Sequence, residues 1–234
     1  MGLPIYIQIH NDIKRNIEAD KWKIGDRIPS ERELSTEFGV SRMTLRQAIQ
    51  TLVDEGILER RVGSGTFVAN QKVQEKMSGV TGFTDLMLAQ GKQPSSKTIS
   101  YHTMEPSLSE MEKLQITQDQ SVLRMERIRY GDDVPICFEV ATVPENIIEG
   151  LEKSEVTSSL YRTLEQKKDL SLGKAQQTVS AMLASERIAE YLDIKRGDAI
   201  LRLRQITYLQ DGRPFEYVRT QYGGDRFEFY LEKE

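Results

Sequence analysis

The chain has 234 residues, 38% of them apolar, which is enough to bury one large core or two ordinary ones. No apolar run approaches the roughly 20 residues that a membrane-spanning helix needs, and the N-terminus lacks the basic-then-apolar order of a secretory signal. Cys137 is the only cysteine, and His10 and His102 are far apart, which excludes an intrachain disulfide and argues against a zinc site. We therefore expect a cytoplasmic protein without a metal or another cofactor.

The formal net charge of -4 is unevenly distributed. Residues 1–72 carry 11 basic and 10 acidic side chains, whereas the remainder carries 21 and 26. This asymmetry favours two parts of different character, but a solvated surface of mixed charge looks the same, so it does not establish nucleic-acid binding. A general DNA-packaging protein would be more basic than this chain.

The first fifty-five residues have the pattern of three helices. Ile9, Ile13 and Ile17 recur every four positions and predict a first helix that stops near Trp22. A capping box of Ser30 and Glu33 predicts a short second helix that ends at Gly39. The third helix is predicted to begin after the cap Ser41 and to run to about Glu55, with one apolar stripe to be buried: Leu45, Ala48, Ile49 and Leu52.

Two arginines flank that stripe, and a hairpin follows the third helix. Arg42 and Arg46 are one helical turn apart on its open side, and Val62-Gly63-Ser64-Gly65 forms a small turn between two extended runs. Arginines at this spacing also fit an ordinary solvated face. The order helix, tight turn, helix and hairpin favours DNA reading, because the second helix of such a motif enters the major groove and an arginine can bind guanine there.

The stretch "SERELSTEFGVSRMTLRQAIQTLVDEGILERRVGSGTFV", with the earlier "PIYIQIHNDIKRNI", resembles the winged helix-turn-helix of the GntR family of bacterial transcription regulators. Many relatives carry a basic residue on each side of the first wing glycine, whereas this chain has Val62 and Ser64, and we expect Arg60 and Arg61 to compensate in part. By position, the resemblance implies these DNA-binding residues: Arg32, Ser41, Arg42, Thr44, Arg46, Gly63, Ser64 and Gly65.

Beyond residue 70 the pattern changes. Residues 70–80 are polar without a deep apolar pattern and are predicted to be a linker. Helical segments ("GFTDLMLAQG", "SSLYRTLEQKK", "SERIAEYLDI") then alternate with strand pairs around the turns "GDD" and "QDGR". The sequence therefore predicts an α+β domain with an antiparallel sheet.

A faint repeat runs through this second part. The segment 114–130 aligns without a gap with 192–208, at an offset of 78, and each copy is followed by a turn, a proline and a Phe-Glu pair. The pattern predicts two related strand-turn-strand halves, with Glu139 and Glu216 in comparable places. Common hairpin features alone can produce the same likeness.

Arg127 and Arg129 are two apart on a predicted strand, so both point to one face, where buried arginines need anionic partners. The partner can be the protein's own carboxylates or a ligand. Helix N-termini near Thr84 and Ser159 offer free N–H groups and hydroxyls for a phosphate or carboxylate.

From about Val80 to its end the chain resembles the UTRA domain of the HutC subfamily, whose sheet is similar to that of chorismate lyase, and within it the repressors of N-acetylglucosamine utilisation, which sense amino-sugar 6-phosphates. The resemblance implies phosphate contacts to Phe83, Thr84, Arg127, Arg129 and Ser159, with Tyr161 close by, and sugar contacts to Glu139, Glu216 and Tyr222. It also implies a winged helix-turn-helix DNA-binding domain over 1–70, a linker over 71–80 and a UTRA effector-binding and dimerisation domain over 81–234.

These features together predict a bacterial, nucleoid-associated homodimer that represses transcription from a palindromic double-stranded DNA operator. The expected effector is glucosamine 6-phosphate or N-acetylglucosamine 6-phosphate, with another phosphosugar or a carboxylate as the alternative. A lyase-like enzyme is the remote alternative, since the sequence shows no nucleophile–base pair and no catalytic residue is assigned.

Overall fold

The fold is taken from a computed structural model, which describes residues 3–69 and 72–232. The chain divides into two compact units, residues 1–71 and 72–234, and each is described by itself. The residues at 1–2, 70–71 and 233–234 lie outside the described residues, so the outermost positions of the predicted domains and linker are not described.

Unit 1 contains the three predicted helices. Ser30 caps the second through a complete capping box with Glu33, and the Ser41 side chain accepts a hydrogen bond from the Thr44 N–H at the start of the third. The buried stripe of the third helix is confirmed, since all four predicted residues are fully buried. The helices are α1 (Ile5–Glu18), α2 (Glu31–Glu37) and α3 (Arg42–Asp54).

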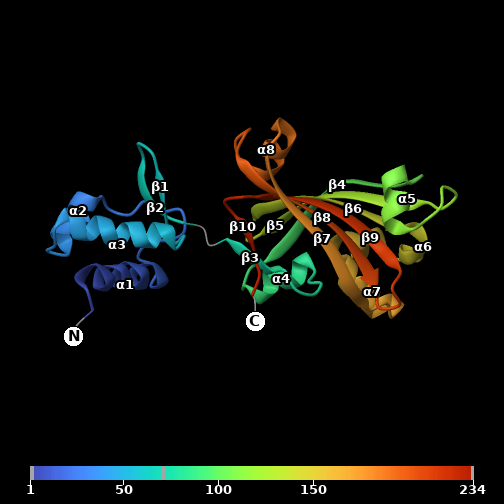
Figure 1. The fold of residues 1–234 in the computed structure, drawn as a ribbon, viewed down its shortest axis with the longest axis horizontal. Coiled ribbons are helices and arrows are strands. Elements are labelled where there is room, and N and C mark those ends of the chain that lie inside the picture. The colour runs from blue at the N-terminus through green and yellow to red at the C-terminus, as the bar shows by residue number, and fades with distance from the viewer. Residues whose placement is uncertain (1–2, 70–71, 233–234) are drawn as a thin grey trace. The chain divides into compact units, whose positions relative to one another are not determined.

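The predicted hairpin is also present in unit 1. Strands β1 (Leu58–Arg61) and β2 (Gly65–Val68) pair antiparallel, and Arg27 adds an isolated bridge to Phe67. Within the unit, α1 lies on one side of α3 and the hairpin on the other (Figure 1). The arrangement is a winged helix-turn-helix, as predicted.

Unit 2 is built on a six-stranded sheet with the order β4-β5-β6-β9-β8-β7, and its neighbouring strands are antiparallel. The tight turns between β5 and β6 and between β8 and β9 fall where the sequence predicted them, and Asp132 and Asp133 both adopt positive φ in the first. The strands are β4 (Pro94–Met104), β5 (Val122–Gly131), β6 (Val134–Pro144), β7 (Leu172–Leu183), β8 (Ala199–Leu209) and β9 (Pro214–Gly223).

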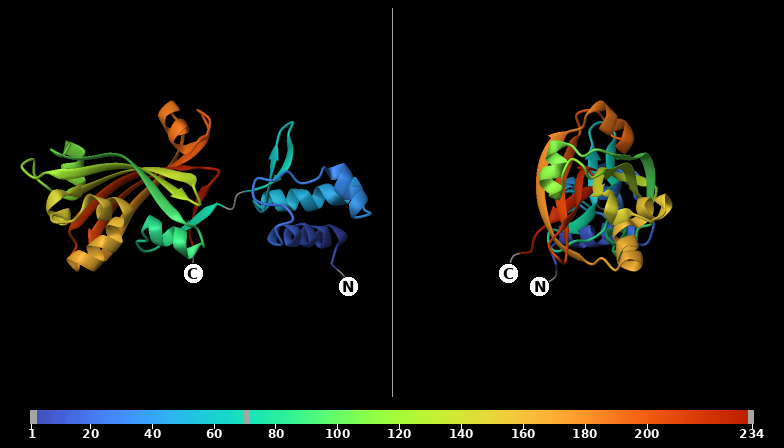
Figure 2. Two further views of the ribbon diagram at one scale, coloured as in Figure 1. Left: turned by 180° about the vertical axis from the view of Figure 1, so that it is seen from behind. Right: turned by 90° about the vertical axis from the view of Figure 1, so that its right-hand side faces the viewer.

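Helices cover both faces of this sheet (Figures 1 and 2). On one face α7 packs against β5 and β6, and α4 contacts the buried side chains of Cys137 and Tyr222. On the other face α8 packs on Ile128 and Phe138, and α5 packs on Val122. The helices are α4 (Phe83–Ala89), α5 (Leu108–Leu114), α6 (Glu145–Ile148), α7 (Lys153–Lys168) and α8 (Glu186–Leu192).

The prediction of a linker over 71–80 is wrong for its central residues. Val73–Lys76 form β3, which pairs in parallel with β10 (Phe227–Tyr230) near the other end of the chain. Val73 is fully buried against Tyr222 and Phe227. A four-residue strand with one apolar side chain is too short to show a periodic pattern, so its partner strand decides its structure.

The repeat extends over more of unit 2 than the sequence indicated. An offset of 78 carries α5 onto α8, and each half has the order helix, edge strand, helix, hairpin. The two Phe-Glu pairs are not equivalent, however. Glu139 lies opposite Arg127, whereas Glu216 lies opposite Thr207, which is the counterpart of Arg129. The structural counterpart of Glu216 is therefore Cys137, and the prediction that the two glutamates occupy comparable places is wrong by two residues.

Candidate functional sites

The exposed side of α3 in unit 1 presents the predicted arginines. Arg42 and Arg46 are exposed, and so is Arg32 on α2. Arg46 forms an ion pair of 3.0 Å with Glu31, while the side chains of Arg32 and Arg42 make no ion pair with any residue that the structure describes. The surface thus offers guanidinium groups beside the first turn of α3.

Glu31 connects this helix to the wing. Its carboxylate accepts a hydrogen bond from Arg46 Nε at 3.1 Å and another from Arg60 Nη2 at 3.4 Å, and Arg60 also donates to Gln50 of α3 at 2.9 Å. Arg61 bonds Glu59 and lies over the ring of Phe67. Both wing arginines are therefore held by unit 1 itself and do not simply replace the missing basic residues at the wing tip.

Ser41 and Thr44 have a structural role at the start of α3. Their hydroxyl oxygens lie 2.9 Å apart, and Ser41 caps the helix through the Thr44 N–H. Any contact of these hydroxyls with DNA has to be made in addition to the cap. An N-cap of this kind contributes about 1 kcal/mol to stability.

The wing tip depends on its glycines. Gly63 has φ +75° and Gly65 has φ +119°, both in the region that glycine favours, and Ser64 is exposed between them. A Cβ atom on Gly65 would lie 2.8 Å from Arg27 Nε. Both positions therefore favour glycine for reasons within unit 1, and a close approach of this tip to a partner stays a prediction.

We expect Gly65→Ala to destabilise unit 1 by about 1–3 kcal/mol, because alanine at this φ is strained and its methyl group displaces Arg27. Trp22, the only tryptophan, lies in the core of unit 1, so its fluorescence during urea unfolding measures this effect. Ser64→Ala is the matched control at the same tip. Equal unfolding midpoints for the two variants would contradict the prediction.

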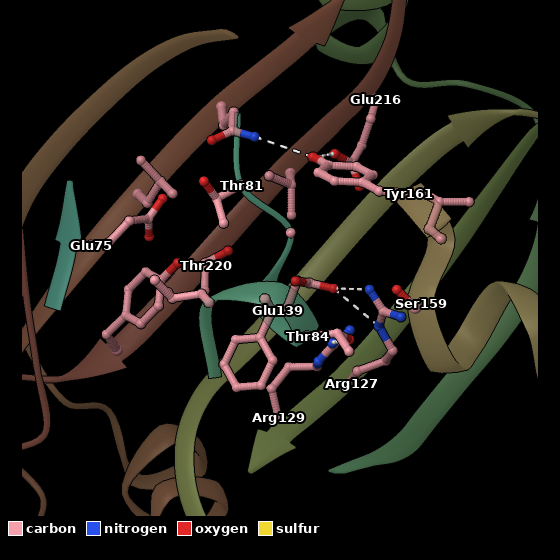
Figure 3. Close-up of a pocket in the computed structure, with 18 residues that line it drawn as sticks. Glu75, Thr81, Thr84, Arg127, Arg129, Glu139, Ser159, Tyr161, Glu216 and Thr220 are labelled. Atoms are coloured by element: carbon pink, nitrogen blue, oxygen red, sulfur yellow. Dashed lines mark hydrogen bonds and ion pairs between the residues drawn. The ribbon is translucent and has the colours of Figure 1, made fainter. Parts of the chain in front are cut away.

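Unit 2 contains a polar pocket on the sheet face covered by α4 and α7 (Figure 3). All nine residues predicted for effector binding line this one pocket, although they come from α4, β5, β6, α7 and β9. They are Phe83, Thr84, Arg127, Arg129, Glu139, Ser159, Tyr161, Glu216 and Tyr222. The structure thus brings them together, while their role in binding remains a prediction.

Arg127 is largely satisfied by the protein. Its Nε donates to Glu139 Oε1 at 3.0 Å, and Nη2 also bonds that carboxylate (Figure 3). Its Nη1 donates to the carbonyl oxygen of Thr157 at 2.8 Å. Burial would raise the pKa of Glu139, but the guanidinium groups of Arg127 and Arg129 outweigh it and lower that pKa. The Glu139 carboxylate is therefore ionised at neutral pH.

Arg129 is only partly satisfied. It is 3% exposed, its Nη2 donates to Thr84 Oγ1 at 3.3 Å, and its guanidinium lies 4.6 Å from the centre of the Phe83 ring. Its Nε is a buried donor with no hydrogen-bond partner among the described residues. Burial and the nearby Arg127 lower the pKa of Arg129 to about 10, so the group stays charged at neutral pH. A buried cation without a full set of acceptors favours an anion beside it.

Two helix starts converge on this end of the pocket. Gly82 precedes α4 without a side-chain cap, and α7 is interrupted at Ser159, whose φ of -153° and ψ of 89° are not helical. The interruption starts a new helical segment at Leu160, and the offset of 78 carries the first residue of α4, Phe83, onto Tyr161, one position further along. Helix N-termini carry unpaired N–H groups and partial positive charge, which suit an anionic ligand.

The opposite end of the pocket carries carboxylates and other polar groups. Glu216 accepts a hydrogen bond from Tyr161 at 2.5 Å (Figure 3). It also accepts one from Thr207 at 3.2 Å. Burial, together with the carboxylate of Glu139, raises the pKa of Glu216 to about 7. Near neutral pH this group can donate or accept a hydrogen bond, depending on its protonation.

The raised pKa predicts a pH-dependent stability. Between about pH 4.5 and pH 7 the unfolded chain has released the Glu216 proton while the folded chain still holds it, so stability falls as pH rises through this window. We expect Glu216→Gln to flatten this slope and to stabilise unit 2 at about pH 7.5 by roughly 1–3 kcal/mol. Urea unfolding by circular dichroism tests unit 2, with Trp22 fluorescence as the internal reference for unit 1. An unchanged slope would disprove the assignment.

Several pocket residues were missed by the sequence analysis. The offset of 78 carries Arg127 onto Gln205, which lines the pocket, and Arg129 onto Thr207, which bonds Glu216. The repeat in the sequence therefore already contained a signal for both residues. Glu75 on β3 was missed because its segment was interpreted as a linker. The pocket residues not predicted are Glu75, Thr81, Gly82, Leu86, Leu160, Leu203, Gln205, Val218 and Thr220.

Within residues 3–69 and 72–232, no set of three His, Cys, Asp or Glu side chains is arranged to hold a metal ion. None of the helices in these ranges combines the length and the apolar character needed to cross a bilayer. Cys137 is buried in the sheet, where burial raises the pKa of its thiol.

A winged helix-turn-helix and a separate unit with a polar pocket define a transcriptional regulator, in which one part of the chain reads DNA and another senses a small molecule. Comparisons with known proteins agree. Residues 5–68 match the family of bacterial regulatory proteins called gntR, and residues 89–228 match the UTRA domain. The chain belongs to the GntR family and is a repressor of the HutC type, with a UTRA domain.

Relatives similar over nearly the whole chain are regulators. The HTH-type transcriptional repressor NagR of Bacillus subtilis (strain 168) is 34% identical over 99% of this chain and 96% of its own length. The mannosyl-D-glycerate transport/metabolism system repressor MngR of Escherichia coli (strain K12) is 31% identical over 97% and 95%.

Solved structures support the same classification. The crystal structure of PhnF from Mycobacterium smegmatis superposes with a TM-score of 0.77 at 27% identity, over 96% of this chain and 98% of that one. A transcriptional regulator of the GntR family from Enterococcus faecalis V583 is 62% identical over 59% of this chain and 100% of that one, with a TM-score of 0.56.

Proposed function

We propose that a small anionic effector binds in the pocket of unit 2 and changes the affinity of this repressor for its operator, and that the effector is an amino-sugar 6-phosphate. The observation that carries the proposal is Arg129, a buried cation with an unpartnered Nε at the pocket wall. Thr84, Ser159 and the two helix starts around it supply the further donors that a phosphate group needs.

The remaining polar groups of the pocket fit a sugar. Glu139, Glu216 and Tyr222 offer carboxylate and hydroxyl groups that can bond the ring hydroxyls or the amino group of a hexosamine. Relatives whose names refer to mannosyl-D-glycerate or to fructoselysine utilisation support a sugar-derived effector in general. Another phosphosugar or a carboxylate is the alternative within the same class.

For unit 1 we propose that Arg42 and Arg46 contact base edges in the major groove and that Arg32, Ser41, Thr44 and the wing tip at Gly63, Ser64 and Gly65 contact the backbone or the minor groove. The protein would act as a cytoplasmic homodimer on a palindromic operator, with half-sites about one helical turn, 34–36 Å, apart. The guanidinium groups of Arg32 and Arg42 support this proposal, because they are exposed and make no ion pair within residues 3–69 and 72–232.

Isothermal titration of the full chain tests the effector. We expect glucosamine 6-phosphate or N-acetylglucosamine 6-phosphate to bind, and a bound ligand to change the affinity for DNA from the region upstream of the chain's own gene. Glucose 6-phosphate and glucosamine are the controls that lack the amino group or the phosphate. Binding of glucosamine alone, or no binding of any hexose phosphate, would reject the proposed effector class.

A further inference from the structure

Glu75 lies where the pocket meets the start of unit 2. It stands on β3 between the exposed residues Gln74 and Lys76, and its backbone pairs with Phe229 of β10. Since side chains alternate along a strand, Glu75 shares the inner side of β3 with the buried Val73. Its carboxylate lines the pocket from the side away from Ser159 (Figure 3).

The Glu75 carboxylate is unpaired among the described residues. It takes part in no hydrogen bond and no ion pair within the described part of the chain, although Gln74 beside it bonds Glu228 at 2.6 Å and Lys76 bonds Glu232. Burial raises the pKa of Glu75 to about 7. A carboxylate in this position is poorly solvated and unpaired, so a donor group of a ligand would stabilise it.

The position of β3 in the chain gives this residue a second role. The two units divide between residues 71 and 72, so β3 is the first element of unit 2. It is short, and three kinds of contact fix it to the rest of the unit: its pairing with β10, the buried Val73, and hydrogen bonds of 3.0 and 2.9 Å between the Gln74 backbone and the Gln90 side chain. Any ligand contact with Glu75 therefore acts directly on the first element of unit 2.

We propose that Glu75 couples the pocket to unit 1 by accepting a hydrogen bond from an ammonium or hydroxyl group of the effector. This inference rests on the proposed function of the pocket. The effector binds more tightly when β3 is paired with β10 than when the two strands are separated, because only the paired strand presents the Glu75 carboxylate to the effector. Such a difference in affinity is what allows a ligand to shift a conformational equilibrium.

The coupling is tested with Glu75→Ala in the full chain, with Gln74→Ala as the matched control on the same strand but outside the pocket. Calorimetry with glucosamine 6-phosphate gives the affinity, and fluorescence anisotropy with a DNA site selected by the parent protein gives operator affinity with and without saturating probe. We expect Glu75→Ala to bind the probe about tenfold more weakly. At saturation its operator affinity should change far less than that of the parent or of the control.

Hydrogen exchange provides a readout that a merely structural role would not change. In the parent, saturating glucosamine 6-phosphate should slow exchange at amides 73–76, and in Glu75→Ala it should not. The same measurements with glucose 6-phosphate identify the donor. If Glu75→Ala loses more affinity for glucosamine 6-phosphate than for glucose 6-phosphate, the contact is to the ammonium group. If it loses the same affinity for both, the contact is to a hydroxyl group.

Two results would overturn the inference, and they are distinguishable. If Glu75→Ala at saturation responds in operator affinity as fully as the parent, Glu75 does not couple the units, while the proposed function stands. If the parent itself neither binds a hexose phosphate nor changes its operator affinity, the proposed function fails and the inference fails with it.

Discussion

Arg129→Gln is expected to abolish binding of the hexose phosphate without destabilising unit 2. The substitution removes a buried cation whose Nε finds no acceptor among the described residues. Ligand affinity should therefore fall by about 100-fold or more. Removing a buried charge that the protein does not fully compensate should leave the melting temperature unchanged or raise it. Calorimetry and thermal unfolding measure the two effects separately.

Arg124→Gln is the matched control, because Arg124 lies on the same strand but faces the other side of the sheet. It makes a two-pronged ion pair with Glu110, which is 2% exposed, with distances of 3.1 and 2.6 Å. We expect this variant to lose roughly 2–4 kcal/mol of stability and to keep its ligand affinity. Loss of stability in Arg129→Gln with ligand binding intact would reverse the roles that we assign to the two arginines.

Arg42→Ala and Arg46→Ala are each expected to weaken operator binding by about 1–3 kcal/mol, which is roughly 10- to 100-fold. The effect of Arg46→Ala should be at least as large as that of Arg42→Ala, because Arg46 also neutralises Glu31 at 3.0 Å. In Arg46→Ala the Glu31 carboxylate loses this ion pair, so its negative charge should repel the phosphates of the DNA more strongly. Gel-shift titrations at a fixed salt concentration measure the losses.

Arg15→Ala on α1 provides the control for these substitutions. Arg15 is exposed and pairs only with Asp12 of the same helix, so the variant should bind the operator as the parent does. Comparison with random DNA separates the two kinds of contact. An arginine that reads bases loses affinity mainly for the operator, whereas one that binds phosphate loses it for all sequences alike.

The elements of unit 1 were predictable because local signals define them. The capping box of Ser30 and Glu33, the cap at Ser41 and the four-residue apolar spacing act within a few residues of chain, and the structure has all of them. Side-chain pairing was not predictable. Glu31 bonds Arg46 and Arg60, residues 15 and 29 positions away, and no local pattern reports such distances.

In unit 2 the hairpins were predictable from their turns, while the edge strands β4 and β7 were not. Both are largely polar or half-buried, and their structure depends on pairing with β5 and β8. The same limit applies to β3, which needs β10 from the far end of the chain. The nine residues predicted for effector binding line one pocket, and it was the resemblance to a family that grouped them, because local sequence patterns carry no information about contacts between distant segments.

The internal repeat has a consequence for how such sensors diversify. The strand order β4-β5-β6-β9-β8-β7 places the pocket across the seam between two halves of common design. The first half supplies the cationic wall through Arg127 and Arg129, and the second supplies Gln205, Glu216 and Thr220. If the pocket binds the phosphosugar that we propose, substitutions in the β8–β9 hairpin would change which sugar is bound, while the β5–β6 hairpin would continue to bind the phosphate through Arg127 and Arg129. The two halves would then determine the identity and the charge of the ligand separately.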